Sequence, residues 1–139
     1  MNVKQFSITT IVGAVVNFIL GYLIYGMLMA SFFEANMGSA TGVMKTPDQL
    51  NLPLLFVGNL AFAALITYIF SHWANISTFA TGMKGGMIIG GLLTLAYNLI
   101  QYSTTNIGNL TASLVDVVVA IVMIGLVGGV IGLVLGKVK

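Results

Sequence analysis

Residues 112–136 read ASLVDVVVAIVMIGLVGGVIGLVLG, an apolar run that carries one charged residue, Asp116, and is followed by Lys137. A helix needs about 20 mainly apolar residues to cross the hydrocarbon core of a bilayer, so this run predicts a membrane-spanning helix. The run is continuous and lacks alternation of apolar and polar residues, which favours a helix over a strand of a membrane barrel.

Three similar runs precede this one, and together they predict an all-α, integral membrane four-helix bundle formed by a single domain, residues 1–139. The first run is too long for the apolar region of a signal peptide, which has about 7–15 residues. It is therefore interpreted as a span. The four predicted spans occupy approximately residues 6–33, 52–72, 84–103 and 112–136.

The composition supports a membrane protein and argues against several other classes. Of 139 residues, 58% are hydrophobic and 6% are charged, whereas a soluble domain carries about 25% charged residues. There is no Arg to build the basic patch that nucleic-acid binding requires. With no Cys and one His, a metal centre within one chain is not expected. No nucleophile–base pair is evident, so we expect neither an enzyme nor a cofactor.

The distribution of lysines predicts the orientation in the membrane. Cytoplasmic loops carry an excess of Lys and Arg. Four lysines fall on one side of the predicted bundle and one on the other, which places both termini in the cytoplasm. The first side holds Lys4, Lys84, Lys137 and Lys139 together with His72, and the second holds Lys45 beside Glu34 and Asp48.

Two helix starts are predicted from capping residues. Thr46-Pro47-Asp48-Gln49 combines an N-cap Thr, a Pro at the first helical position and a Gln that can close a capping box. It predicts a short turn that leads into the second span. Thr111 is the predicted cap of the fourth span.

Small residues recur along each span at helical spacing, which predicts glycine-rich packing faces, or a glycine zipper. Glycine lets helix backbones approach closely in a membrane. On the fourth span this face comprises Gly125, Gly128, Gly129, Gly132 and Gly136. The matching stripes are Gly82, Gly86 and Gly90 on the third span, Thr10, Gly13, Asn17 and Gly21 on the first, and Asn59, Ala63 and Thr67 on the second.

Asp116 is the one ionisable residue within a predicted span, and such residues are functional hypotheses by default. Counted from the span ends, Asn59, Asn98 and Gln101 share the outer half of the bilayer with Asp116, and Asn17 lies near the middle. In one interpretation, Asp116 is an interfacial residue and the amide side chains form hydrogen bonds between helices. The other makes them a site for a proton or a cation.

Asp116 and the glycines occupy opposite sides of the fourth span. At about 100° per residue, Asp116 lies about 140–180° from Gly125, Gly129 and Gly132. In a straight helix they cannot all face the bundle centre. Because a carboxylate facing lipid is costly, we expect Asp116 to face the bundle and the glycines to meet another chain. This predicts a homo-oligomer or a subunit of a larger membrane complex.

Residues 17–26, NFILGYLIYG, and Leu114-Val115-Asp116 before the glycine-rich helix carry a family resemblance. The chain resembles a group of uncharacterised small bacterial inner-membrane proteins with four spans, known as a domain of unknown function. The resemblance implies a bacterial inner membrane and Asp116 as a family feature, but no activity. The chain departs from that pattern at residues 117–119, where Val replaces the more polar residues expected.

Two functional hypotheses follow. The leading one is a non-enzymatic oligomeric or accessory membrane subunit, whose partners are the lipid bilayer and other membrane chains. The alternative is a small ion or proton channel or transporter that uses Asp116 and the intramembrane amides.

Overall fold

The computed structural model describes residues 2–138, and this part of the chain is all-helical. Its helices are α1 (Val3–Gly21), α2 (Ala30–Ala35), α3 (Leu52–His72), α4 (Phe79–Thr104) and α5 (Leu110–Lys137), with a π-helical turn η1 (Tyr22–Leu28) after α1 and a 3-10 turn η2 (Pro47–Gln49) before α3. Within the described residues, four helices are long and apolar enough to cross a membrane: α1 with η1, α3, α4 and α5. The predicted all-α fold is therefore confirmed, and four of its helices have the length and apolar composition that the predicted spans require.

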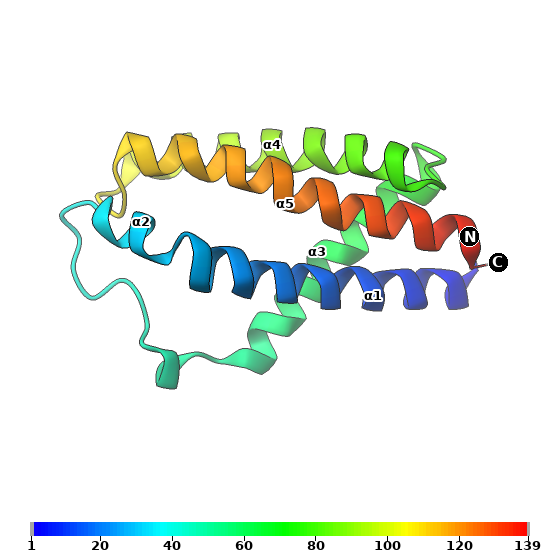
Figure 1. The fold of residues 1–139 in the computed structure, drawn as a ribbon, viewed down its shortest axis with the longest axis horizontal. Coiled ribbons are helices and arrows are strands. Elements are labelled where there is room, and N and C mark those ends of the chain that lie inside the picture. Colours follow the sequence, from blue (N-terminus) through cyan, green and yellow to red (C-terminus); the bar gives the residue numbers. More distant parts are fainter. Residues whose placement is uncertain (1, 139) are drawn as a thin grey trace.

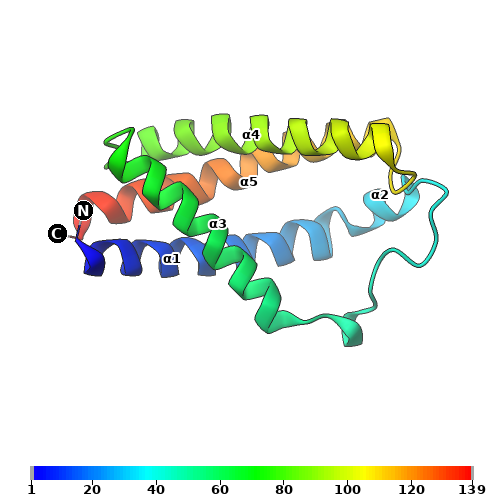
Figure 2. The ribbon, with the colours of Figure 1, turned by 180° about the vertical axis from the view of Figure 1, so that it is seen from behind.

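The four long helices form two pairs that pack on each other. In Figure 1, α4 and α5 lie side by side, and α1 runs below α5. Figure 2 shows α3 crossing α1 obliquely, so that its later end approaches α4 while its beginning points away from the bundle. The two ends of the chain lie at the same end of the bundle (Figure 1), as an even number of crossings requires.

The first long helix is less regular than predicted, since the structure divides residues 6–33 into three segments. The α-helical ladder of α1 widens at η1, where the backbone N–H of Met29 donates to the carbonyl oxygen of Ile24 at 2.8 Å. A short helix, α2, follows and carries the chain to the outer loop. The π-helical turn contains Tyr25, and π-helical turns occur frequently at functional sites.

The third span begins earlier than the predicted residue 84, because Thr78 caps it. The Thr78 hydroxyl accepts from the backbone N–H of Thr81 at 3.2 Å. The expectation that Lys84 closes the preceding loop is therefore wrong. Lys84 is exposed within α4, where its long side chain can extend toward the membrane surface.

Of the two predicted helix starts, one is confirmed and one is wrong. The Gln49 side chain accepts from the Thr46 backbone N–H at 3.3 Å and closes the capping box of η2. For α5 the cap is Asn109 rather than Thr111. The Asn109 side chain accepts from the Ala112 backbone N–H at 2.8 Å, in keeping with the stronger preference for Asn at this position.

Glycines bring the backbones of α4 and α5 into direct contact. A Cβ added to Gly128 would lie 2.9 Å from the Gly86 Cα, and a Cβ added to Gly132 would lie 3.0 Å from the Gly82 Cα. The remaining glycines of the predicted faces have partners in the same chain: Gly125 meets Met87, Gly129 meets Phe79, Gly136 meets Ser77, Gly90 meets Ile124, Gly13 meets Ile131 and Gly21 meets Met123.

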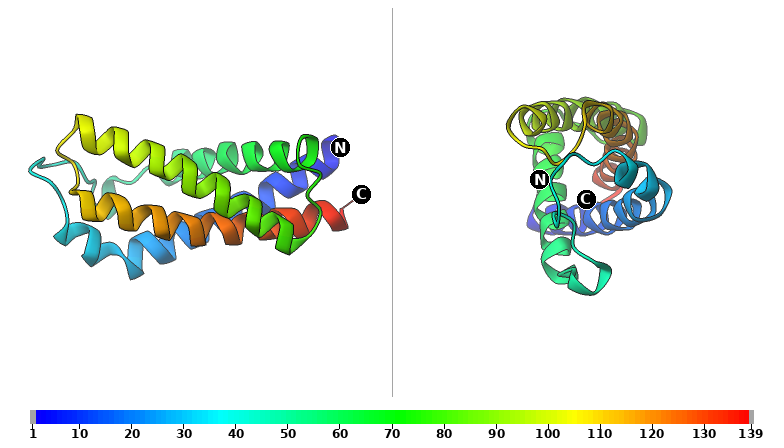
Figure 3. Two further views of the ribbon diagram at one scale, coloured as in Figure 1. Left: turned by 90° about the horizontal axis from the view of Figure 1, so that it is seen from above. Right: turned by 90° about the vertical axis from the view of Figure 1, so that its left-hand side faces the viewer.

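The glycine face of α5 therefore contacts α4, where the sequence analysis assigned it to another chain. The expectation assumed that the residues of α5 that contact another helix all lie on one side of α5. Instead, the two helices cross (Figure 3, left), and their contact follows residues four apart. At 3.6 residues per turn, each step of four moves about 40° around the helix. Along α5 the contact thus moves from Asp116 to Gly132, on the opposite side, without leaving α4.

An apolar core fills the bundle at the end where the two termini lie. Its fully buried members come from three different helices. They are Ala14 on α1, Ala63, Ile66 and Phe70 on α3, and Val127 and Ile131 on α5. These side chains fill the space between the three helices in this half of the bundle.

The contact between α4 and α5 predicts opposite effects for two matched substitutions. Gly128→Ala places a methyl group against the backbone of α4, so the helices must separate at a cost of about 1–3 kcal/mol. Gly58→Ala on α3 meets nothing within 4 Å and should raise stability by up to about 1 kcal/mol through helix propensity. Reversible unfolding in mixed micelles measures both; equal effects would contradict the assignment of this contact.

Candidate cation-binding site

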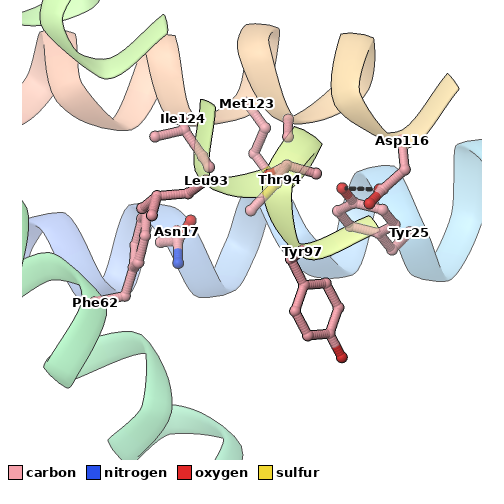
Figure 4. Close-up of a pocket in the computed structure, with 10 residues that line it drawn as sticks. Asn17, Tyr25, Phe62, Leu93, Thr94, Tyr97, Asp116, Met123 and Ile124 are labelled. Carbon is pink, nitrogen blue, oxygen red and sulfur yellow. Dashed lines mark hydrogen bonds between the residues drawn. The ribbon is translucent and has the colours of Figure 1, made fainter. Parts of the chain in front are cut away.

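The Asp116 carboxylate is held by two side chains from different helices. The Tyr25 hydroxyl donates to Asp116 Oδ1 at 2.6 Å, the bond drawn in Figure 4. The amide nitrogen of Asn98 donates to Asp116 Oδ2 at 2.7 Å and to the carbonyl oxygen of Ser113 at 3.0 Å. These short distances are typical of donors to a carboxylate. Asp116 thus faces the bundle interior, as predicted.

The electrostatic surroundings of Asp116 leave room for a positive charge. Both hydrogen-bond partners, Tyr25 and Asn98, are neutral. A carboxylate has about four lone-pair sites, and these partners use two. The helix α5 begins at Leu110, about 9 Å before Asp116 at 1.5 Å per residue, so its positive N-terminus lends only part of a charge. Neither hydrogen-bond partner therefore supplies a positive charge to this half-buried group.

A second polar pair lies deeper in the bundle. The Asn17 amide nitrogen donates to Asn59 Oδ1 at 2.7 Å, and the Asn59 nitrogen donates to the carbonyl oxygen of Leu55 at 2.8 Å. Because the Asn59 nitrogen is already used, Asn59 presents its oxygen, which fixes the orientation of both amides. The Asn17 oxygen is left buried and without a hydrogen-bond partner among the described residues.

Two cavities meet at Asp116. The inner cavity, about 330 Å³, extends from Asn17 to Asp116 (Figure 4), and the outer cavity, about 240 Å³, lies toward the loops. Tyr25 and Asp116 line both. The hydrogen bond between these two side chains therefore separates the outer cavity from the one that reaches into the bundle.

The outer cavity is lined by paired loops. The backbone N–H of Gly38 donates to the Ile107 carbonyl oxygen at 2.9 Å, and the Asn109 side chain donates to Asn36 Oδ1 at 2.9 Å. These bonds fasten the loop after α2 to the turn between α4 and α5. The cap of α5, Asn109, thus also anchors the loops that line the outer cavity.

Toward the other end, the site is closed by the apolar core. The buried hydroxyls of Thr9, Thr10 and Thr67 have no hydrogen-bond partner within residues 2–138. They lie between the Asn17–Asn59 pair and the end of the bundle that carries the termini. In this conformation neither cavity extends to that end.

The structure brings the predicted polar residues together in two groups rather than one. Asp116 joins Asn98, and Asn17 joins Asn59; Asp116 and Asn17 also line the same cavity. Gln101 does not bond to the carboxylate but donates to the Tyr97 hydroxyl at 3.4 Å and lines the outer cavity.

Tyr25 was not predicted, although the sequence held a signal for it. It continues the spacing of four that runs through Asn17 and Gly21 on the first span. His72, expected at a membrane edge, ends α3 and stacks on Tyr68 with ring centroids 4.4 Å apart. Within residues 2–138 no group of three His, Cys, Asp or Glu side chains could hold a metal ion.

The fold and site define the chain as an all-helical protein with four helices able to cross a membrane and a carboxylate in its interior. No protein-family model matches the chain, and no curated protein or solved structure matches it either.

The Tyr25–Asp116 bond predicts a measurable coupling. Tyr25→Phe removes the donor without changing the ring, and we expect it to lower stability by about 1–2 kcal/mol. Tyr22→Phe, on the exposed side of the same turn, should change stability little. In a double-mutant cycle with Asp116→Ala, which removes both acceptor oxygens, the two effects should be non-additive; purely additive effects would contradict the bond.

Proposed function

We propose that this protein carries a proton or another monovalent cation across a membrane, and that Asp116 is the group that binds it. The observation that carries the proposal is the position of Asp116 between two cavities, held by the neutral donors Tyr25 and Asn98. An intramembrane carboxylate without a basic partner is costly, and a bound proton or cation removes that cost.

The arrangement supports a carrier rather than an open channel. Access to Asp116 exists on the side of the loops, whereas Ile66, Phe70 and Ile131 close the other side. A carrier exposes its site to one side at a time, which fits this asymmetry. The unpaired hydroxyls of Thr9 and Thr67 would face the pathway when the inner half opens.

The two helix pairs provide the moving parts. The strongest contacts join α4 with α5 and α1 with α3. Asp116 and Asn98 belong to the first pair, and Tyr25 and Asn17 to the second. The Tyr25–Asp116 bond links the pairs, so a movement of one pair against the other would open the site toward the opposite side.

We place the protein in a bacterial inner membrane with both termini in the cytoplasm. The positive-inside rule supports this orientation: Lys4 and Lys137 lie at the end of the bundle that holds the termini, and Lys45 lies in the opposite loop. The loops over the outer cavity then face the periplasm, and the site takes its cation from there.

The other candidate, an oligomeric or accessory subunit, has less support. It was based on a free glycine face on α5, and that face contacts α4 within the same chain. Association with a second copy or a larger complex would have to use another surface. The beginning of α3, where Gly58 is exposed, offers a surface for such an association.

Flux through liposomes tests the proposal. Purified protein should dissipate an imposed proton or potassium gradient, and Asp116→Asn should reduce the flux to that of empty liposomes because the amide cannot hold the charge. Asp48→Asn, which removes a carboxylate from the exposed outer loop, is the matched control and should retain full flux. Equal flux through the Asp116→Asn and unmodified proteins would overturn the proposal.

The orientation has its own test, since the chain contains no Cys. Single cysteines at Ser77 and Thr105 would lie in the connections at the two ends of α4. A membrane-impermeant maleimide added to intact cells should label Thr105→Cys and leave Ser77→Cys unlabelled until the cells are opened. The reverse pattern would invert the proposed topology.

A further inference from the structure

The inner cavity has a polar side chain at each end. At one end is the Asp116 carboxylate, and at the other is Asn17, a side chain that is 8% exposed and whose buried amide oxygen has no partner in the described chain. Figure 4 shows the Asn17 nitrogen turned toward α3 and its oxygen turned away from it. Asn17 and Tyr25, which holds Asp116, are eight residues apart, or about 12 Å along a helix.

The walls between these two side chains are mainly apolar. They are formed by Phe62 on α3, Leu93 on α4, and Met123 and Ile124 on α5, together with Thr94. A cavity of this kind, of about 300 Å³ or more with a few converging polar groups, is typical of small-molecule sites. An occupant must therefore be polar at both ends and apolar between them.

We propose that this cavity binds an organic cation: an ammonium group at Asp116, an apolar body against Phe62 and Leu93, and a hydrogen-bonding group at the Asn17 side chain. This inference rests on the proposed function in one respect, the assignment of Asp116 as the cation-binding group. It names the class of cation that the site accepts.

A bare metal ion fits the cavity less well. Ions such as Mg²⁺ and Ca²⁺ need about six or more oxygen ligands, whereas the inner cavity offers one carboxylate, one amide and three hydroxyls (those of Tyr25, Thr94 and Tyr97) spread along its length. An ammonium group needs few acceptors. Aromatic rings such as that of Phe62 also attract organic cations and their apolar parts.

The mouth of the cavity faces the gap between α3 and α4. Leu93 and Tyr97 line the cavity and are 49% and 64% exposed, and α3 diverges from α4 away from their connection (Figure 2). An amphiphilic amine can therefore enter from the bilayer with its apolar body first and place its charge at Asp116.

Three probes of the same shape test the inference: tyramine, 2-phenylethylamine and tyrosol. Tyramine has an ammonium and a distal phenol donor. Phenylethylamine lacks the distal donor, and tyrosol replaces the ammonium by a neutral hydroxyl. Binding to the protein in nanodiscs of zwitterionic lipid is measured by calorimetry, with empty nanodiscs subtracted. We expect tyramine to bind about tenfold or more tightly than tyrosol and about fivefold more tightly than phenylethylamine.

Variants separate the contributions of the charge and of the cavity. Asp116→Asn should remove the preference for tyramine over tyrosol. Leu93→Trp should fill the cavity and abolish binding, whereas Leu92→Trp on the adjacent exposed position should bind tyramine as the unmodified protein does. Absence of tyramine binding, or equal binding of all three probes, overturns this inference. Proton or potassium flux that depends on Asp116 would still support the proposed function, so the two failures are distinguishable.

Discussion

The close approach of α4 and α5 sets the positions of the other helices. Where Gly82 and Gly86 meet Gly128 and Gly132, no side chain separates the two backbones, and van der Waals contact between them replaces the hydrophobic drive that a bilayer does not supply. The contact follows residues four apart, so the helices cross instead of running parallel. This crossing leaves the start of α5 open toward α1, and that opening is where Asp116 lies.

The first helix contacts α5 through a row of residues spaced by four. Gly13 admits Ile131, Gly21 lies against Met123, and Tyr25 reaches Asp116. At the far end, the Gln5 side chain donates to the carbonyl oxygens of Leu135 and Val138 at 3.0 and 2.6 Å. The same row thus closes the end of the bundle that holds the termini with apolar and backbone contacts and supplies polar groups to the opposite end.

Hydropathy and charge predicted most of the fold, because four apolar runs in a chain of this length leave little choice. The pairing of Asn98 with Asp116 could also be anticipated from their common depth. Which helix faces contact one another could not be anticipated from the sequence. A face read at 100° per residue assumes a straight contact, and the crossing of α4 and α5 moves the contact around α5. Tyr25 was missed because a tyrosine near a span end is commonly interfacial, and only the π-helical turn and the neighbouring helix show that it points inward.

The position of Tyr25 connects binding at Asp116 to the arrangement of the helix pairs. Tyr25 lies on the α1–α3 side and Asp116 on the α4–α5 side, so their hydrogen bond is a link between the two. In the proposed carrier, a cation bound to the carboxylate draws on its negative charge, which weakens the hydrogen bond that it accepts from Tyr25. Occupancy and the separation of the pairs are then coupled, since a ligand shifts a conformational equilibrium by its differential affinity for the two states. A single carboxylate with neutral partners can serve both as the binding group and as the contact that binding releases.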